Sequence, residues 1–198
     1  MDEAANDPGW PSIGAVARTL WTVVMPGARV RLYQHQLAAG RNGLTLLRVV
    51  YVQCVVMSLA VGVVIVVMDA RGTVSHATTA IWTAVVLAVG AACVVLPRRL
   101  DPPLACTSDA ALATTYTNRF FIRVTVAQAP TLVGFVAALV AQSVLVGCVA
   151  VGFSIVAYVL AAPTRRQLAT DQRDLDASGC HRALLPAVVR GGRPAAGH

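Results

Sequence analysis

The sequence predicts an all-α, polytopic membrane protein whose four transmembrane helices form two hairpins, with both termini in the cytoplasm. Composition is the first reason, since 57% of the 198 residues are hydrophobic and 13% are charged, against about 25% charged in a soluble domain. The second reason is that the apolar residues gather in long runs, and the third is that arginines flank these runs unevenly. The length suits one compact bundle.

The longest apolar run covers residues 120–162 and predicts two of the four helices. Its 43 residues would form a single helix of about 65 Å, roughly twice the thickness of the ~30 Å hydrocarbon core of a bilayer. The run is therefore expected to fold back on itself, with the polar pair Gln142 and Ser143 at the turn. The third span precedes this turn, and the fourth runs from there to residue 162, before Pro163.

Two earlier apolar runs predict the first and second spans, at residues 46–68 and 79–96. A short polar loop separates them, and Pro97 ends the second. Ser58 and Gly62 lie four residues apart in the first span, a spacing of small side chains that lets another helix approach closely. Residues 46–162 are therefore expected to form the four-helix transmembrane bundle.

The stretch between the second and third spans contains a break and a predicted helix start. Residues 101–103 (Asp-Pro-Pro) make the break, and residues 107–109 (Thr-Ser-Asp) are typical of a helix N-terminus with an acid in its first turn. We expect this helix to continue through Tyr116 and Arg119 into the third span without interruption.

The two ends of the chain are expected to lie outside the bilayer core. Residues 1–45 form a cytoplasmic segment in which apolar residues at helical spacing, from Ile13 to Val24, predict an amphipathic helix in the membrane interface; the alternative is a helix docked on the bundle's cytoplasmic face. Residues 163–198 are polar and predict a cytoplasmic, largely disordered tail. Truncation after Arg166 is therefore expected to leave insertion and accumulation intact.

The orientation follows from the basic residues, all sixteen of which are arginine. Five lie in the N-terminal segment through Arg48, three between the second and third spans, and six in the tail, whereas the opposite loops hold only Arg71. The positive-inside rule then places both termini in the cytoplasm and the protein in the cell inner (plasma) membrane. Arginine without lysine, with abundant Ala and Val, is typical of a GC-rich, actinobacterial genome.

Few polar side chains interrupt the spans, and none is Asp, Glu, Lys or His, the groups that proton and cation carriers usually need in the membrane. Gln128 is expected near the bilayer midplane, where its amide needs a hydrogen-bond partner such as Gln53 or Ser58. Pro130 predicts a kink because it cannot donate to the helix. The predicted packing seam comprises Gln53, Ser58, Gly62, Gln128, Pro130, Gly134 and Ala138. The alternative is a polar point that lines a lipid or partner groove.

Three arginines lie at the cytoplasmic edge of the spans: Arg48, Arg119 and Arg123. Arginine side chains can keep their stems in apolar surroundings while the charged head reaches the interface. We therefore expect these three to contact lipid headgroups, with Arg123 as a candidate anchor for an anionic lipid.

Catalytic and metal-binding signatures are absent from the sequence. The five cysteines are scattered singly, without a C-x-x-C, so neither a disulfide framework nor a zinc site is expected. Asp171 and Asp174 are expected to belong to a solvated, charged tail. The net charge of +7 does not indicate nucleic-acid binding, because the arginines flank apolar spans instead of forming one basic surface. No enzyme activity, cofactor or metal is predicted.

Residues 119–140 (RFFIRVTVAQAPTLVGFVAALV) resemble the outer helix of the ATP-synthase proteolipid, subunit c. In that family the helix carries a carboxylate, and the matching position here is Gln128, which has no proton to exchange. The resemblance implies a related hairpin shape without the proton function. The overall layout is also similar to small four-helix actinobacterial membrane proteins, some of which are accessory subunits of Mce-type lipid transporters.

These patterns together predict a non-enzymatic accessory or scaffolding subunit that packs against another membrane protein, a further copy of itself in a homo-oligomer, or membrane lipids. The alternative is a small transporter or channel subunit for a lipid or other small molecule, which would need a polar path through the bundle. A membrane-embedded enzyme is a third class that no motif supports.

Overall fold

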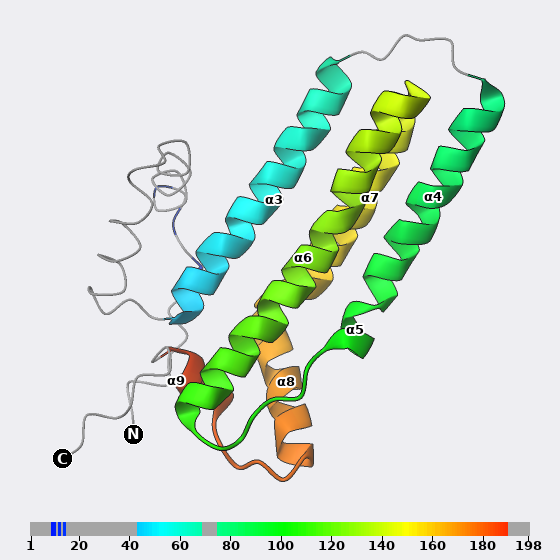
Figure 1. The fold of residues 1–198 in the computed structure, drawn as a ribbon. Helices are drawn as coiled ribbons and strands as arrows, with labels where there is room; N and C mark the ends of the chain where they lie inside the picture. The colour runs from blue at the N-terminus through cyan, green and yellow to red at the C-terminus, as the bar shows by residue number, and fades with distance from the viewer. Residues whose placement is uncertain (1–8, 11, 13, 15–42, 69–74, 190–198) are drawn as a thin grey trace. The chain divides into compact units, whose positions relative to one another are not determined.

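The computed structural model describes residues 9, 10, 12, 14, 43–68 and 75–189. Helices and their connections make up this part of the chain, which contains no strand. The helices, drawn in Figure 1, are α3 (Gly43–Val67), α4 (His76–Val95), α5 (Pro97–Leu100), α6 (Asp109–Ala141), α7 (Val144–Ala161), α8 (Arg165–Ala177) and α9 (Leu184–Val189). The predicted N-terminal amphipathic helix, the basic connector after it and residues 190–198 lie outside the described residues.

Four of the described helices, α3, α4, α6 and α7, are long and apolar enough to cross a membrane. The prediction of an all-α chain with four candidate spans is therefore confirmed. The longest, α6, has 33 residues and begins where the sequence predicts: the Ala111 backbone N–H donates to the Ser108 side-chain oxygen at 3.1 Å. It continues without interruption through Arg119 and through Pro130.

The chain forms two compact units. The span unit comprises residues 54–101 and 121–162, and the end unit comprises residues 1–53, 102–120 and 163–198. Both α3 and α6 contribute residues to each unit, so the boundary falls within these two helices.

Small residues bring the helices of the span unit together. A methyl group built on Gly134 of α6 would overlap the Cβ of Ala150 on α7, and one built on Gly90 of α4 would overlap the ring of Phe153 on α7. On the α3 side, Gly62 lies against Val151 of α7. Helix α7 therefore contacts α3, α4 and α6, and its small residues set how closely they approach.

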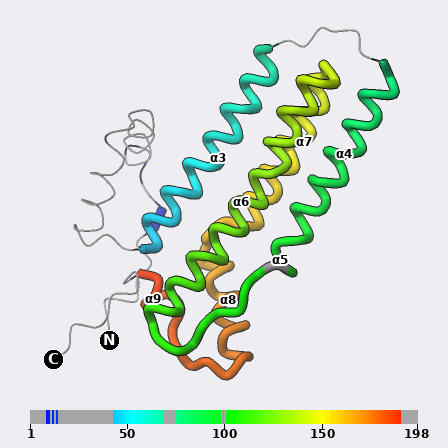
Figure 2. The backbone as a smooth tube through the Cα atoms, in the orientation of Figure 1, coloured from blue at the N-terminus to red at the C-terminus, as the bar shows by residue number. Residues whose placement is uncertain are grey.

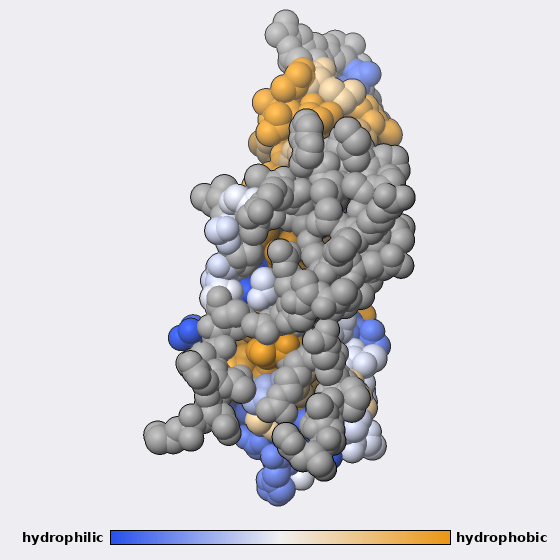
Figure 3. All heavy atoms as spheres, turned by 90° about the vertical axis from the view of Figure 1, so that its left-hand side faces the viewer, coloured by the Kyte–Doolittle hydropathy of each residue, from blue (hydrophilic) through white to orange (hydrophobic). Residues whose placement is uncertain are grey.

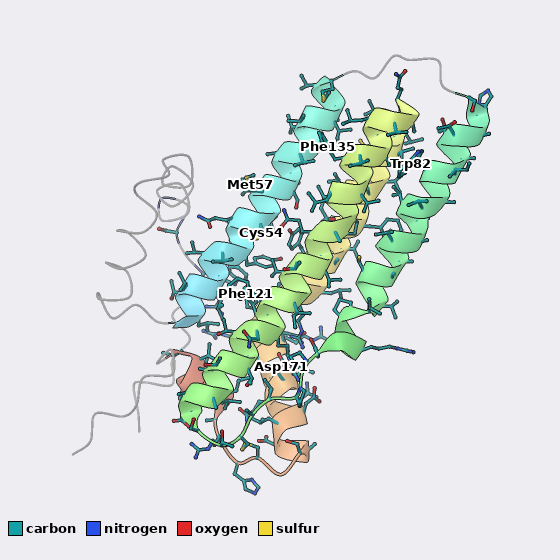
Figure 4. All side chains as sticks on the ribbon, viewed as in Figure 1. Cys54, Met57, Trp82, Phe121, Phe135 and Asp171 are labelled. Atoms are coloured by element: carbon teal, nitrogen blue, oxygen red, sulfur yellow. A yellow bond between two sulfur atoms is a disulfide. The ribbon has the colours of Figure 1, made fainter. Side chains whose placement is uncertain are left out.

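The apolar core of the span unit lies where α4, α6 and α7 meet. It contains Val86, Ala137, Val146 and Ala150, and Trp82, labelled in Figure 4, packs against it. Helix α6 ends at Ala141 and α7 begins at Val144, with Gln142 between them at φ 44°. The break between α6 and α7, the third and fourth spans, thus falls at the polar pair that the sequence predicts. The path of the backbone through this break can be followed in Figure 2.

Much of the apolar surface of the span helices is not covered by protein. In their most apolar windows, 17% of residues are buried in α3 and in α4, against 44% in α6 and 39% in α7. Figure 3 shows apolar side chains gathered on one such face. Outward apolar surface of this extent fits helices that meet lipid or another membrane protein.

Candidate functional site: polar contacts of the two units

Within the span unit, α3 and α7 are joined by a hydrogen-bonded chain around the buried Tyr158. The Tyr158 hydroxyl lies 3.2 Å from the Ser58 hydroxyl and donates to the backbone carbonyl of Cys54 at 3.4 Å. Since Tyr158 donates its only proton to that carbonyl, Ser58 is the donor to Tyr158. Sequence reasoning placed Ser58 in the packing seam and missed Tyr158, whose phenol carries a polar hydroxyl within a mainly apolar span.

A second polar link joins α6 to α7 beside Pro130. The Thr131 backbone N–H donates to the Ser154 side-chain oxygen at 3.0 Å, and both residues are fully buried. This link lies one residue beyond a proline that has no N–H to donate. The Thr131 hydroxyl is the buried side-chain oxygen in the described part that lacks a partner.

Gln128, the expected centre of the seam, lacks the hydrogen bond that we expected its side chain to make. Its side chain is half-buried and makes no hydrogen bond to any described residue. The expected partner Ser58 is bonded to Tyr158 instead, and Gln53 belongs to the end unit. Thus α6 is tied to α7 by Thr131 and Ser154, and the Gln128 amide is left at the surface of the unit.

Arg123 forms a largely buried ion pair within the span unit. Its Nε lies 3.0 Å and 3.2 Å from the two carboxylate oxygens of Asp101, and its Nη2 also contacts that carboxylate. The side chains are 11% and 14% exposed. A two-point pair of this kind is stronger than a neutral hydrogen bond, and it fixes the start of the loop after α5 to α6.

Arg119 makes the corresponding pair in the end unit. Its Nη1 lies 3.3 Å from Oδ1 of Asp171 on α8, and its Nη2 donates to the Pro102 carbonyl at 2.7 Å. Asp171, labelled in Figure 4, is 1% exposed. The carboxylate that composition assigns to a solvated tail is thus a buried partner of an arginine on α6.

Arg48 is the most deeply buried of the arginines whose burial the structure describes, with 0% of its surface exposed. It donates to the Gly9 carbonyl at 2.6 Å and, through Nε and Nη2, to the Pro163 carbonyl at 3.4 Å. Its guanidinium also lies 5.3 Å from the centre of the Trp10 ring, which is a cation–π distance. Arg48 therefore links three separate segments of the end unit.

The three arginines expected to contact lipid headgroups have protein partners in the structure. Arg48, Arg119 and Arg123 are all buried, and each binds protein oxygens. Their partners lie between 17 and 115 residues away in the chain, so no local pattern in the sequence indicates them.

The end unit also contains a disulfide that the cysteine spacing did not predict. Cys106, in the loop before α6, is bonded to Cys180, which follows α8, and their Cα atoms are 5.9 Å apart. Nearby, Arg182 binds the Asp109 carboxylate at 2.6 Å and the Thr107 carbonyl at 3.4 Å. Scattered cysteines thus meet because the fold brings two distant segments together.

The prediction of a largely disordered tail is wrong for residues 165–189. Helices α8 and α9 bury one face each, formed by Leu168, Asp171, Leu175, Leu184, Ala187 and Val188. Thr164 caps α8 by accepting from the Gln167 N–H at 3.3 Å. Leucines seven residues apart on one helix face were the available signal, which the many charges around them masked.

Among the residues that the structure describes, no group of three or more His, Cys, Asp or Glu side chains could hold a metal ion. Comparisons with protein-family models, with curated proteins and with solved structures found no match to this chain.

Proposed function

We propose that this protein is a non-enzymatic accessory or scaffolding subunit of the inner (plasma) membrane that packs against another membrane protein, a second copy of itself or lipid. In this proposal the four spans form two hairpins and both termini are cytoplasmic. An accessory role in a lipid transporter of the Mce type is its most specific form, and it rests on the resemblance of layout alone.

The half-buried Gln128 amide, which has no hydrogen-bond partner among the described residues, carries the proposal. The Ser58 hydroxyl and the Thr131 N–H of the span unit are bonded internally, to Tyr158 and Ser154, and the Thr131 hydroxyl, which lacks a partner among the described residues, is buried within the protein. An amide without a partner in hydrocarbon costs several kcal/mol. A polar group on a neighbouring protein would offset that cost, and the exposed Leu132 and Val136 on the same helix would pack around it.

The cytoplasmic orientation is supported by arginines that remain at the surface. Arg99, Arg165 and Arg166 are exposed next to the ends of α4 and α7. In the proposal these residues, in place of the three buried arginines, face the anionic headgroups of the cytoplasmic leaflet.

Site-specific photocrosslinking in cells tests the partner directly. A photoreactive residue at position 128 or 132 is expected to give one discrete protein adduct in high yield. The same residue at the buried Val86 is the matched control and is expected to give none. Crosslinks to lipid alone from both positions 128 and 132 would contradict the packing role with a protein.

The Gln128→Glu variant distinguishes packing from transport. A charged group near the midplane of a dry helix face costs about 2.5–3.5 kcal/mol on insertion scales, so this variant should be clearly less stable in detergent than wild type. A water-filled path would accept the carboxylate with little loss, and equal thermal stability would favour the transporter alternative.

A further inference from the structure

We propose that the Cys106–Cys180 disulfide is a reversible thiol–disulfide lock on helices α8 and α9. The proposal concerns the end unit alone and does not depend on which partner the spans bind. It joins three observations: the geometry of the pair, the contacts that surround it, and the unequal exposure of its two cysteine residues.

Contacts besides the disulfide join the two segments that carry the cysteines. Their Cα separation of 5.9 Å lies within the range of about 4.4–6.8 Å at which the bond forms without backbone movement. Arg182 holds the segment after Cys180 to Asp109, and Thr115 accepts from the Ala105 N–H beside Cys106 at 3.2 Å. The two thiols therefore stay close after reduction, and the bond can form again without refolding.

The two cysteine residues differ in exposure. Cys106 is exposed, whereas Cys180 is 3% exposed. An external thiolate can therefore attack the Cys106 sulfur, forming a mixed disulfide and releasing Cys180 as a thiolate that takes up a proton. A second thiol then attacks the mixed disulfide. The balance is one protein disulfide and two low-molecular-weight thiols giving two protein thiols and one small disulfide, and oxidation is the reverse.

The bond determines how firmly α8 and α9 are held. It joins positions 74 residues apart, so it ties Cys180, which lies between α8 and α9, to the loop before α6. In the oxidised state the two helices cannot leave this loop. In the reduced state the ion pairs, the Arg182–Thr107 hydrogen bond and the buried faces of α8 and α9 remain without the covalent bond, and local opening becomes more frequent.

The test uses the purified full chain in detergent, equilibrated with reduced and oxidised glutathione at a series of ratios. The pair is quantified by alkylation and mass spectrometry, and trypsin cleavage after Arg173 and Arg182 is timed in each state. We expect reversible conversion without denaturant, and tail cleavage about tenfold or more slower when oxidised. Cys106→Ser and Cys180→Ser should both cleave at the reduced rate under all conditions, and Cys148→Ser, on α7, should behave like wild type.

Three results would overturn the lock: no disulfide under oxidising conditions, equal cleavage rates in both states, or a bond that excess thiol cannot reduce without denaturant. The last result would mean that the bond is a permanent structural disulfide. In cells, acid trapping should find the pair reduced at rest and oxidised after a thiol oxidant. A pair that is reversible when purified but fully oxidised in resting cells would leave the chemistry intact, remove a regulatory role, and contradict the cytoplasmic orientation.

Discussion

The span unit and the end unit are stabilised by different kinds of contact. In the span unit, glycines and alanines bring helices together and two neutral hydrogen-bonded links join them, with Arg123 and Asp101 as the ion pair at its edge. In the end unit, buried arginines bind carbonyls and a buried carboxylate, and a disulfide joins distant segments. Close packing stabilises a unit through many small contributions. The stability of a buried charge instead depends strongly on each of its partners.

The largest expected effect is therefore in the end unit. Asp171→Ala would leave Arg119 as a buried cation without its carboxylate, a change that typically costs 3–5 kcal/mol. We expect the temperature at which trypsin begins to cleave within α8 and α9 to fall sharply. Asp174→Ala, on the exposed side of the same helix, should change it little. Equal effects of the two variants would show that the buried pair does not govern the unit.

An intermediate effect is expected where helices of the span unit touch. Gly134→Ala would push a methyl group into Ala150 on α7, and overpacking of this kind costs about 1–3 kcal/mol. Gly152→Ala is the matched control, because a methyl group there meets no atom within 4 Å, so the variant should be as stable as wild type or more. Thermal unfolding in detergent measures both. A Gly134→Ala protein with unchanged stability would mean that α6 and α7 are less closely packed than described.

A smaller effect is expected for the link beside Pro130. Ser154→Ala removes the acceptor of the Thr131 N–H, and interhelical hydrogen bonds in membrane proteins average about 0.6 kcal/mol, with a maximum near 1.7. Thr125→Val, which removes an exposed hydroxyl from α6, should have no measurable effect. A loss above about 3 kcal/mol for Ser154→Ala would show that this serine does more than accept one bond.

The smallest effect is expected at Gln128 in the isolated protein. Because its amide has no partner among the described residues, Gln128→Leu should change the stability of the purified chain by less than about 0.5 kcal/mol. The same variant should reduce crosslinking to the partner in cells from a photoreactive residue at position 132. A strong destabilisation of the purified chain would instead reveal an internal partner for the amide.

Local sequence patterns predicted the helices well and the site poorly. The four spans, the start of α6 and the break at Gln142 each follow from a few adjacent residues, because they depend on solvent preference and on free backbone groups. The partners of Arg119 and Arg123, Asp171 and Asp101, are 52 and 22 residues away, and Cys180 is 74 residues from Cys106. The composition of a stretch indicates whether it prefers water or lipid, but it does not indicate which charged residues pair in the fold. In the tail, the many charged residues hid the pattern of the two leucines that lie on the buried face of α8.

The Arg119–Asp171 pair also has a consequence for how the chain is made. Synthesis runs from the N-terminus, so α6 can enter the membrane long before the carboxylate of Asp171 leaves the ribosome. A nascent or prematurely terminated chain would carry Arg119 without that carboxylate and Cys106 without its thiol partner, in contrast to the tolerance of truncation that composition suggests. Helices α8 and α9 would then distinguish a complete chain from an incomplete one. Fragments ending after Arg166 would be recognised as incomplete and degraded.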